Sequence, residues 1–373
     1  MKYTLCITQQ CNLRCDYCYI DKNEARMPLN IAEEAIDFIY RLTPPNENID
    51  IGFFGGEPLL EFNLIKAITQ VIENHPDFDR ERVELNLVTN GTIYSGEIAD
   101  FIEEHDIGFG ISCDGPPQVH DKYRRDAHGK GSGTMVTRNI RRAIRRFPGL
   151  MVNAVYRPQT LQHLPDVVDY LASLGLTQIY LNPDFSATWS TSDAAMLPEI
   201  YDRIAERYIE NYFEGQPLYI NLIDSKITVI LRGGYQPLER CRMGKGEMAF
   251  AANGNIFPCE RLVGSGEASE HCIGRIGKGL NLERMTCHTA PSLNDECSTC
   301  GLREYCVRWC GCSNYFSSGY YNRVGPFLCA SERAAVQVSY NTIETMEKRA
   351  GSLFSDHVAG DPAINSAIAQ SLT

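Results

Sequence analysis

Short apolar runs alternate with amphipathic stretches through the first half of the chain. The runs have the length and continuous hydrophobicity of buried parallel strands, and they lie at residues 3–8, 49–54, 83–89, 107–113, 151–156 and 178–182. Between them, apolar residues recur at helical spacing and predict helices from about residue 31, around residues 64–72, and at 95–104, 135–147, 160–173 and 195–213. The first of these helices is expected to be capped by Asn30, with Glu33 three residues later. The alternation predicts an α/β fold with a parallel sheet and right-handed crossovers.

Chemically distinctive segments directly follow four of these strands. They are the cysteines at 11, 15 and 18, then Gly55-Gly56-Glu57-Pro58, Thr89-Asn90-Gly91 and Ser112-Cys113-Asp114-Gly115. The carboxyl ends of parallel strands meet at one edge, so we expect these segments to converge on one face.

The pattern changes in the second half of the chain. Helical periodicity weakens after residue 215, and from Cys241 the sequence is rich in Gly, Cys and Asn. A final helix is expected at about residues 330–348. We therefore predict a large α/β domain, a bridging region, a small cysteine-rich domain, a C-terminal helix and a flexible tail, at residues 1–215, 216–240, 241–330, 331–349 and 350–373.

Composition narrows the possible partners and compartment. The 373 residues include 35 Lys plus Arg against 47 Asp plus Glu, and this net charge of −12 argues against a nucleic-acid partner. The apolar run at the N-terminus is too short for a signal peptide or a membrane span, so we expect a cytoplasmic protein with no membrane partner. In a reducing cytosol, the 15 cysteines are expected to serve metals or redox chemistry rather than disulfides.

The first three clustered cysteines favour an iron–sulfur cluster with one open iron. Cys11, Cys15 and Cys18 supply three thiolates, whereas clusters that only carry electrons normally take four. A structural zinc site also needs four closed ligands, and the nearby Cys6 falls inside a predicted strand, where we interpret it as core.

The segment C-x-x-x-C-x-aromatic-C, with Tyr17 as the aromatic residue, resembles the signature of the radical SAM family. The resemblance implies that S-adenosylmethionine chelates the open iron and is cleaved to a 5′-deoxyadenosyl radical. The segment Gly55-Gly56-Glu57-Pro58 is similar to the GGEP segment of that family, which lies against the methionine amino group.

Other segments resemble the cofactor-binding regions of the family less specifically. Ser112 and Asp114 are similar to its ribose-contacting region, and Arg124 or Arg125 is a candidate contact for the carboxylate of S-adenosylmethionine. Asn90 has two interpretations of equal weight, as a cofactor contact and as part of an Asn-Gly turn. Cys113 is most simply a small buried hydrophobe.

The later cysteines resemble the SPASM extension found on many radical SAM enzymes. Their spacing is Cys241-x12-Gly254-x4-Cys259, then Cys297-x2-Cys300-x5-Cys306-x3-Cys310, and finally Cys329. The resemblance implies an outer auxiliary cluster on Cys297, Cys300, Cys306 and Cys329, and a second one on Cys241, Cys259 and Cys310. The second set has three cysteines and lacks a fourth ligand. Either Cys272, Cys287 or Cys312 supplies it, or one iron of this cluster stays open to a substrate thiolate.

Glu260 follows Cys259 at the position where anaerobic sulfatase-maturating enzymes carry a proton-accepting aspartate. It is a candidate general base, or it forms an ion pair with Arg261.

Together the resemblances imply a partial (β/α)6 radical SAM barrel followed by a SPASM domain, with three 4Fe–4S clusters in all. The leading hypothesis is an enzyme that modifies a ribosomally synthesised peptide, supplied with electrons by a flavodoxin or ferredoxin. Because the first strand begins at residue 3, peptide recognition is expected from the barrel or from a separate leader-binding protein. The alternatives are a sulfatase maturase that forms formylglycine, a SPASM enzyme acting on a sugar or amino acid, and a non-catalytic metal-binding module.

Overall fold

A computed structural model provides the structure, and it describes residues 1–264, 269–286, 292, 294–351 and 354. The chain forms two compact units that are interleaved along the sequence. The first unit comprises Met1–Ser112, Asp121–Arg146 and Arg242–Ala290, and the second comprises Cys113–His120, Phe147–Cys241 and Pro291–Thr373. The predicted domain boundaries at residues 215, 240 and 330 remain predictions from the sequence.

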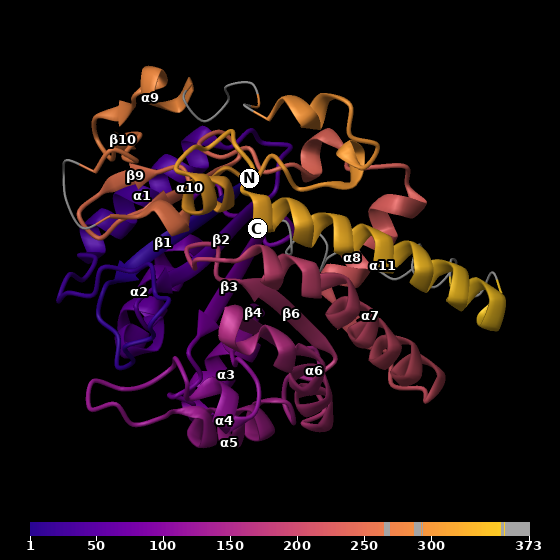
Figure 1. Ribbon diagram of the computed structural model, residues 1–373. Coiled ribbons are helices and arrows are strands. Elements are labelled where there is room, and N and C mark those ends of the chain that lie inside the picture. The colour runs from indigo at the N-terminus through magenta and orange to yellow at the C-terminus, as the bar shows by residue number, and fades with distance from the viewer. Residues whose placement is uncertain (265–268, 287–291, 293, 352–353, 355–373) are drawn as a thin grey trace. The chain divides into compact units, whose positions relative to one another are not determined.

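A mixed sheet forms the centre of the first unit (Figure 1). Its strands follow the order β11-β10-β9-β8-β1-β2-β3-β4. Strands β8, β1, β2, β3 and β4 are parallel neighbours, whereas β8, β9, β10 and β11 are joined by antiparallel pairings. The strands are β1 (Lys2–Thr8), β2 (Ile49–Gly55), β3 (Val83–Thr89), β4 (Ile107–Ser112), β8 (Glu247–Phe250), β9 (Asn255–Phe257), β10 (Gly274–Arg275) and β11 (Gly279–Leu280).

The central strand β1 is covered on both faces. Tyr3, Leu5 and Ile7 on one face have no exposed surface, and Thr4 and Cys6 on the other are 4% and 2% exposed. Helix α1 buries one apolar stripe, formed by Ala32, Ala35, Ile36, Ile39 and Tyr40. The helices of this unit are α1 (Leu29–Leu42), η1 (Pro58–Glu61), α2 (Phe62–Glu73), α3 (Gly96–Glu104), α5 (Gly133–Ala143), η4 (Glu260–Leu262) and α9 (Leu282–Thr286).

The second unit has three parallel strands among its described residues, β5 (Met151–Tyr156), β6 (Gln178–Pro183) and β7 (Tyr219–Ile220). The long helix α11 lies along α7 and α8, as Figure 1 shows, and Ser339 on α11 donates a hydrogen bond to the Ile223 carbonyl of α8 at 3.2 Å. Its helices are α4 (Pro117–His120), η2 (Pro158–His163), α6 (Leu164–Ser173), α7 (Thr191–Phe213), α8 (Asn221–Leu231), η3 (Pro237–Glu239), η6 (Asp295–Ser298), η7 (Arg303–Tyr305), α10 (Gly311–Ser318) and α11 (Pro326–Ala350).

The predicted strands all form, and each helix predicted between them has an observed counterpart. The predicted cap of α1 is wrong: the helix begins at Leu29, and the carbonyl of Pro28 accepts the first backbone hydrogen bonds without any side-chain cap. Of the predicted tail, Phe354 is buried and packs against Tyr212, and residues 352–353 and 355–373 lie outside the described part of the chain.

Among the elements beyond residue 215 that were not predicted are helix α8 and strand β8. Helix α8 is buried nearly all round, and its buried residues include Asp224, Lys226 and Thr228, so it shows no alternation of polar and apolar faces. Strand β8 continues the sheet by pairing in parallel with β1, although it begins at the buried residue Glu247. The region from Cys241 onward is therefore partly strand rather than loop.

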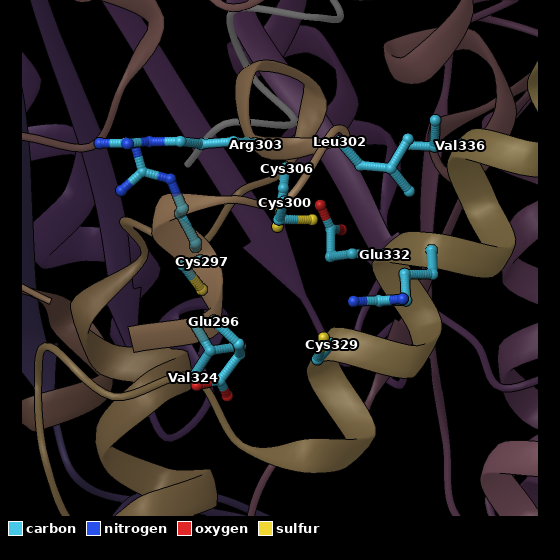
Figure 2. Close-up of a pocket in the computed structure, with 12 residues that line it drawn as sticks. Glu296, Cys297, Cys300, Leu302, Arg303, Cys306, Val324, Cys329, Glu332 and Val336 are labelled. Carbon is cyan, nitrogen blue, oxygen red and sulfur yellow. The ribbon is translucent and has the colours of Figure 1, made fainter. Parts of the chain in front are cut away.

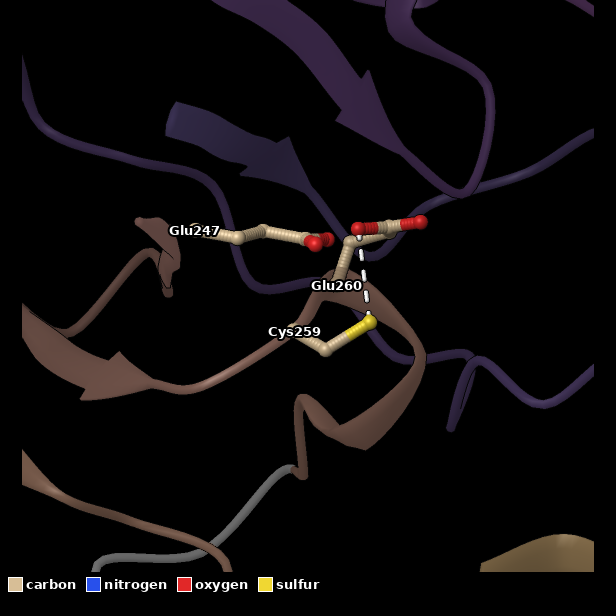
Figure 3. A group of neighbouring side chains, drawn as sticks. All are labelled: Glu247, Cys259 and Glu260. Carbon is tan, nitrogen blue, oxygen red and sulfur yellow. Dashed lines mark hydrogen bonds between the residues drawn. The ribbon is translucent and has the colours of Figure 1, made fainter. Parts of the chain in front are cut away.

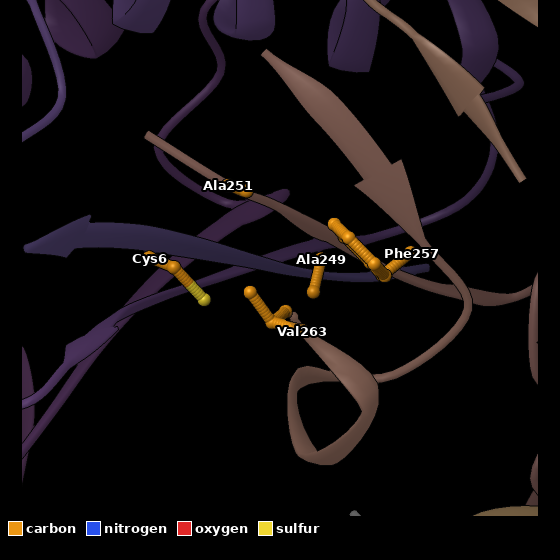
Figure 4. Close-up of a cluster of buried hydrophobic side chains, with 5 residues drawn as sticks. All are labelled: Cys6, Ala249, Ala251, Phe257 and Val263. Carbon is orange, nitrogen blue, oxygen red and sulfur yellow. The ribbon is translucent and has the colours of Figure 1, made fainter. Parts of the chain in front are cut away.

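Cys6 belongs to the core, as predicted. It is 2% exposed and packs with Ala249, Ala251, Phe257 and Val263, which come from the β8–β9 hairpin and the segment after it (Figure 4). We expect Cys6→Ala to lower the free energy of unfolding by about 1 kcal/mol and to leave the iron bound per chain unchanged. Denaturant titration and iron analysis measure the two quantities, and a loss of iron would show that Cys6 is a ligand.

Candidate functional site

The loop after β1 carries the first three clustered cysteines. Cys11, Cys15 and Cys18 are all half-buried. The Cys11 sulfur accepts a hydrogen bond from the Leu13 backbone at 3.4 Å, and the Cys18 N–H donates to the Cys15 carbonyl at 3.1 Å. A backbone donor aimed at sulfur stabilises the thiolate, which is the form that binds metal. One short segment therefore presents all three sulfurs, as a cluster with an open iron requires.

The Gly-Gly pair after β2 packs against the backbone of this loop. The Gly56 N–H donates to the Thr8 carbonyl at 2.9 Å, and the Glu57 N–H donates to the Gln10 carbonyl at 2.8 Å. A Cβ added to Gly55 would lie 2.1 Å from the Thr8 oxygen, and one added to Gly56 would lie 2.1 Å from the Gln10 oxygen. Both glycines are therefore needed for the sheet edge to approach the cysteine loop, a contact that the sequence did not reveal.

Glu57 joins the ends of two strands. Its side chain is fully buried, and its carboxylate accepts hydrogen bonds from the Leu59 N–H at 3.0 Å, the Thr89 hydroxyl at 2.7 Å and the Asn90 N–H at 2.7 Å. Burial raises the pKa of this carboxyl above its ordinary value, against the effect of the three hydrogen bonds. Pro58, also buried, then begins η1. The carboxylate thus fixes the turn after β2 to the turn after β3.

Asn90 forms the predicted turn, and its role as a cofactor contact remains a prediction. Its neighbour Gly91 has a φ of +74°, so the pair does form a turn. The Asn90 side-chain amide also points toward the cysteine loop, where it donates to the side-chain Oδ1 of Asn12 at 2.8 Å and lies 3.7 Å from the Cys11 sulfur. The turn after β3 and the loop after β1 are therefore in direct contact.

Of the two candidate arginines, Arg124 lies at the cysteine loop. It is 6% exposed, and its guanidinium carbon lies 5.3 Å from the centre of the Tyr17 ring. The Tyr17 ring also meets the edge of Tyr123. Arg125 donates instead to the Asp121 carbonyl. Arg124 thus places a positive charge beside the aromatic residue of the cysteine motif.

Ser112 ends β4 in the first unit, whereas Cys113 and Asp114 belong to the second. Asp114 is 3% exposed and its carboxylate accepts a hydrogen bond from the Val155 N–H of β5 at 2.9 Å. Its own N–H donates to the imidazole of the buried residue His120 at 3.2 Å. Cys113 has no exposed surface, as expected. The ribose-binding role of Ser112 and Asp114 remains a prediction.

Four cysteines line a single hollow in the second unit (Figure 2). They are Cys297, Cys300, Cys306 and Cys329, and the hollow is also lined by Arg303, Arg308 and Arg333. Burial raises the pKa of the Cys306 thiol to about 12, so a thiolate at this position requires a strong positive charge such as that of a metal. Glu296 and Glu332 line the same hollow. Four cysteines are a suitable ligand set for a four-iron cluster, and this cluster remains a prediction.

The proposed ligands of the other auxiliary cluster are divided between the units. Cys259 is buried in the first unit, whereas Cys241 and Cys310 are half-buried in the second, so this ligand set remains a prediction from the family resemblance. Among the candidates for a fourth ligand, Cys312 is buried and its sulfur lies 3.7 Å from that of Cys310. The Cys272 thiol donates to the Gly274 carbonyl at 3.2 Å, and Cys287 lies outside the described residues.

Glu260 is next to a second carboxylate. Figure 3 shows its side chain beside that of Glu247 on β8, and the Cys259 sulfur is 3.6 Å from a Glu260 oxygen. Burial is the largest single influence on the pKa of Glu260 and acts to raise it. The charges of Lys2 and Arg261 and hydrogen bonds that include one with Glu247 together hold the pKa below its ordinary value. Arg261 is therefore not its only cationic neighbour, and its role as a general base remains a prediction.

Comparisons with known proteins agree with this geometry. The model of the radical SAM superfamily matches residues 5–171, which include the cysteine loop and the segments after β2, β3 and β4. These residues form a radical SAM domain. The protein is accordingly an enzyme that contains a radical SAM domain.

Similarity to individual proteins extends beyond this domain. The chain is 23% identical to a cysteine-type anaerobic sulfatase-maturating enzyme of Clostridium novyi over 328 residues, which are 81% of this chain and 85% of the relative. The fold of this chain also matches the solved structure of anSMEcpe with bound AdoMet and the Cp18Cys peptide. The match has a TM-score of 0.75 and 18% sequence identity, and it covers 93% of this chain and 99% of anSMEcpe.

A second solved structure is Streptococcus suis SuiB bound to the precursor peptide SuiA. It matches with a TM-score of 0.60 and 14% identity, over 88% of this chain and 75% of SuiB. The radical SAM fold with a cysteine-rich C-terminal region is thereby confirmed. Among the described residues, no helix combines the length and apolar character of a membrane span.

Several residues that contact the predicted site residues were not themselves predicted from the sequence. Thr89 stands directly before the Asn-Gly pair and bonds to Glu57, so a hydroxyl next to a recognised motif was the available signal. His120 is fully buried four residues before Arg124, but a single histidine carries no spacing signal. Asn12 lies inside the cysteine motif at a position that the motif leaves open.

Proposed function

We propose that this enzyme modifies a peptide or protein substrate after reductive cleavage of S-adenosylmethionine. The observation that supports this most directly is the fold match along nearly the whole of both chains to anSMEcpe, a protein solved with AdoMet and a peptide bound. SuiB, solved with its precursor peptide, has a similar fold. A peptide modification such as a thioether, a carbon–carbon crosslink or a related oxidation is the leading form of the proposal.

The residues of the first unit provide a suitable place for the cofactor. When bound, a cluster on Cys11, Cys15 and Cys18 together with S-adenosylmethionine supplies the 5′-deoxyadenosyl radical. Glu57 and Asn90 fix the turns after β2 and β3 against the cysteine loop. Their hydrogen bonds keep the loop in one conformation, because movement would leave buried polar groups without partners.

The charged groups near the loop suit a zwitterionic ligand. Arg124 is a buried cation above Tyr17, and we propose that it orients the carboxylate of S-adenosylmethionine. The backbone around Gly55 and Gly56 is proposed to face the methionine amino group, with the glycines allowing this strand end to approach the loop.

Sulfatase maturation is the second candidate. It is favoured by the alignment with the Clostridium novyi sulfatase-maturating enzyme, which covers more than four-fifths of each chain. The presence of Glu260 where that family carries an aspartate favours a different substrate. The two candidates differ in product, so the same assay separates them.

The test is a substrate assay on the anaerobically reconstituted enzyme, supplied with reductant and S-adenosylmethionine. It is offered short peptides encoded beside its gene and, separately, a sulfatase-derived peptide with the target cysteine. Mass spectrometry identifies each product. A crosslink removes two hydrogen atoms from the peptide, whereas formylglycine formation replaces the thiol of cysteine with an aldehyde oxygen.

A modified neighbour-encoded peptide supports the leading proposal, and formylglycine supports the second. The Cys15→Ala variant is the control, and it should leave every peptide unchanged. If no peptide is modified, and 5′-deoxyadenosine rises only when a sugar or free amino acid is added, the peptide proposal is wrong and a small-molecule substrate replaces it.

A further inference from the structure

A buried ion pair lies beside the hollow lined by four cysteines. Lys226 on α8 and Glu332 on α11 meet with 2.7 Å between the Nζ and Oε2 atoms, and their side chains are only 4% and 12% exposed. Removing two charges from water is costly, and a buried ion pair is often no more stabilising than an apolar pair of the same size. The folding energy alone therefore gives little reason for charges at this position.

The pair holds the backbone on both sides of Cys306. The Lys226 ammonium donates to the Tyr305 carbonyl at 3.0 Å, and the Val307 N–H donates to the same Glu332 oxygen at 2.7 Å. The two peptide groups next to this cysteine are thus each bonded to one member of the ion pair. These hydrogen bonds fix the peptide groups on both sides of Cys306. They therefore restrict the direction of the Cys306 Cα–Cβ bond and the position of the Cys306 sulfur.

The same pair is connected to a second cysteine of the hollow. Glu332 lies three residues after Cys329 on α11, so both side chains project from the same face of this helix. Figure 2 shows Glu332 extending into the space between Cys329 and the segment of Cys306. Lys226 is further held by a hydrogen bond to the Tyr235 hydroxyl at 3.3 Å.

We infer that Lys226 and Glu332 are positioning residues, which hold Cys306 and Cys329 at the separation that one iron–sulfur cluster requires. This inference rests on the proposed ligand set of Cys297, Cys300, Cys306 and Cys329. Assembly of the cluster then depends on Lys226 and Glu332, although neither residue is a ligand. An apolar pair would fill the same space but would leave the Tyr305 carbonyl and the Val307 N–H without these partners.

The experiment compares a single and a double variant of the full chain. Lys226→Met leaves the Glu332 carboxylate buried without its ion-pair partner, so it should both lower the thermal unfolding temperature and impair cluster assembly. The double variant Lys226→Met/Glu332→Met replaces the charges with an apolar pair and should recover most of the unfolding temperature. Both variants should still lose about four irons per chain after anaerobic reconstitution, together with one component of the electron paramagnetic resonance spectrum of the reduced protein.

Arg232→Met is the matched control. This substitution removes a cation from the C-terminal end of α8. The Arg232 side chain is 40% exposed, and its Nη1 atom lies 2.7 Å from Oε1 of Glu239. This variant should retain the wild-type iron content, because the pair is an exposed one that joins the end of α8 to η3 and does not bond to the backbone beside Cys306 as Lys226 and Glu332 do. Unfolding is measured before reconstitution, so that folding and cluster assembly are recorded separately.

Cys306→Ala distinguishes the two ways in which the inference can fail. If Cys306→Ala loses about four irons but the double variant retains the wild-type iron content and spectrum, the positioning role is wrong and the ligand set stands. If Cys306→Ala itself retains all its iron, the ligand set is wrong and the inference falls with it. Iron loss that only follows the fraction of unfolded protein in each variant also overturns the positioning role.

Discussion

Replacing Cys15 with alanine is expected to abolish formation of 5′-deoxyadenosine from S-adenosylmethionine. The Cys15 carbonyl accepts the Cys18 N–H, so this residue lies at the turn that brings the cysteines of the loop together. A three-cysteine site has no spare ligand, and the loss of one thiolate leaves two irons without a protein ligand. We expect the variant to lose about four irons per chain while the other cysteine region keeps its own.

Cys6→Ala is the control for this prediction, because Cys6 lies on the adjacent strand β1 but is part of the core. It should retain both iron and activity. Chromatographic measurement of 5′-deoxyadenosine, together with iron analysis of the same samples, gives the comparison. Equal product from Cys15→Ala and wild type would show that the radical arises elsewhere.

Replacing Gly56 with alanine is expected to lower the free energy of unfolding by about 3 kcal/mol. The added Cβ would lie 2.1 Å from the Gln10 carbonyl oxygen, and this neighbour is backbone that cannot turn aside as a side chain can. Relief requires the cysteine loop to move away from the end of β2. The hydrogen bonds from Gly56 to Thr8 and from Glu57 to Gln10 would lengthen with it.

Gly96→Ala is the matched control. Gly96 is the first residue of α3, and a Cβ added there meets nothing within 4 Å. Alanine is the better helix former, so this variant should be neutral or more stable by up to about 1 kcal/mol. Denaturant titration measures both variants, and a Gly56→Ala protein as stable as Gly96→Ala would show that the loop does not need this close approach.

The parallel part of the fold was predictable because its strands are continuous apolar runs and its helices are amphipathic. Strands β1 to β6 and the helices between them carry these patterns over their whole length. Helix α8 carries no such pattern, since it is buried nearly all round and includes the charged residues Asp224 and Lys226. Its position depends on partners distant in sequence, among them Glu332 and Tyr305.

The candidate site was predictable at the level of residue type and spacing. The cysteines at 11, 15 and 18 lie on one loop, as their spacing suggested, and Cys297, Cys300, Cys306 and Cys329 line one hollow, as the family resemblance implied. The contacts of Glu57 were not predictable, since its carboxylate is occupied by donors from Leu59, Thr89 and Asn90. A motif identifies the residue, but its hydrogen-bond partners depend on which turns meet at the sheet edge.

The choice between Arg124 and Arg125 was likewise not predictable from the sequence. Adjacent arginines are equivalent in sequence, yet only Arg124 stacks on Tyr17 and is buried. Arg125 points to the Asp121 carbonyl because successive side chains leave the backbone in different directions.

Cleavage of S-adenosylmethionine by the wild-type enzyme is the most direct test of a radical-generating site at Cys11, Cys15 and Cys18. The protein is reconstituted without oxygen, its iron content is verified, and it is then mixed with a reductant and S-adenosylmethionine. We expect 5′-deoxyadenosine and methionine in equal amounts. If protein with its full iron content forms neither product, the assignment of Cys11, Cys15 and Cys18 as a radical-generating site is wrong.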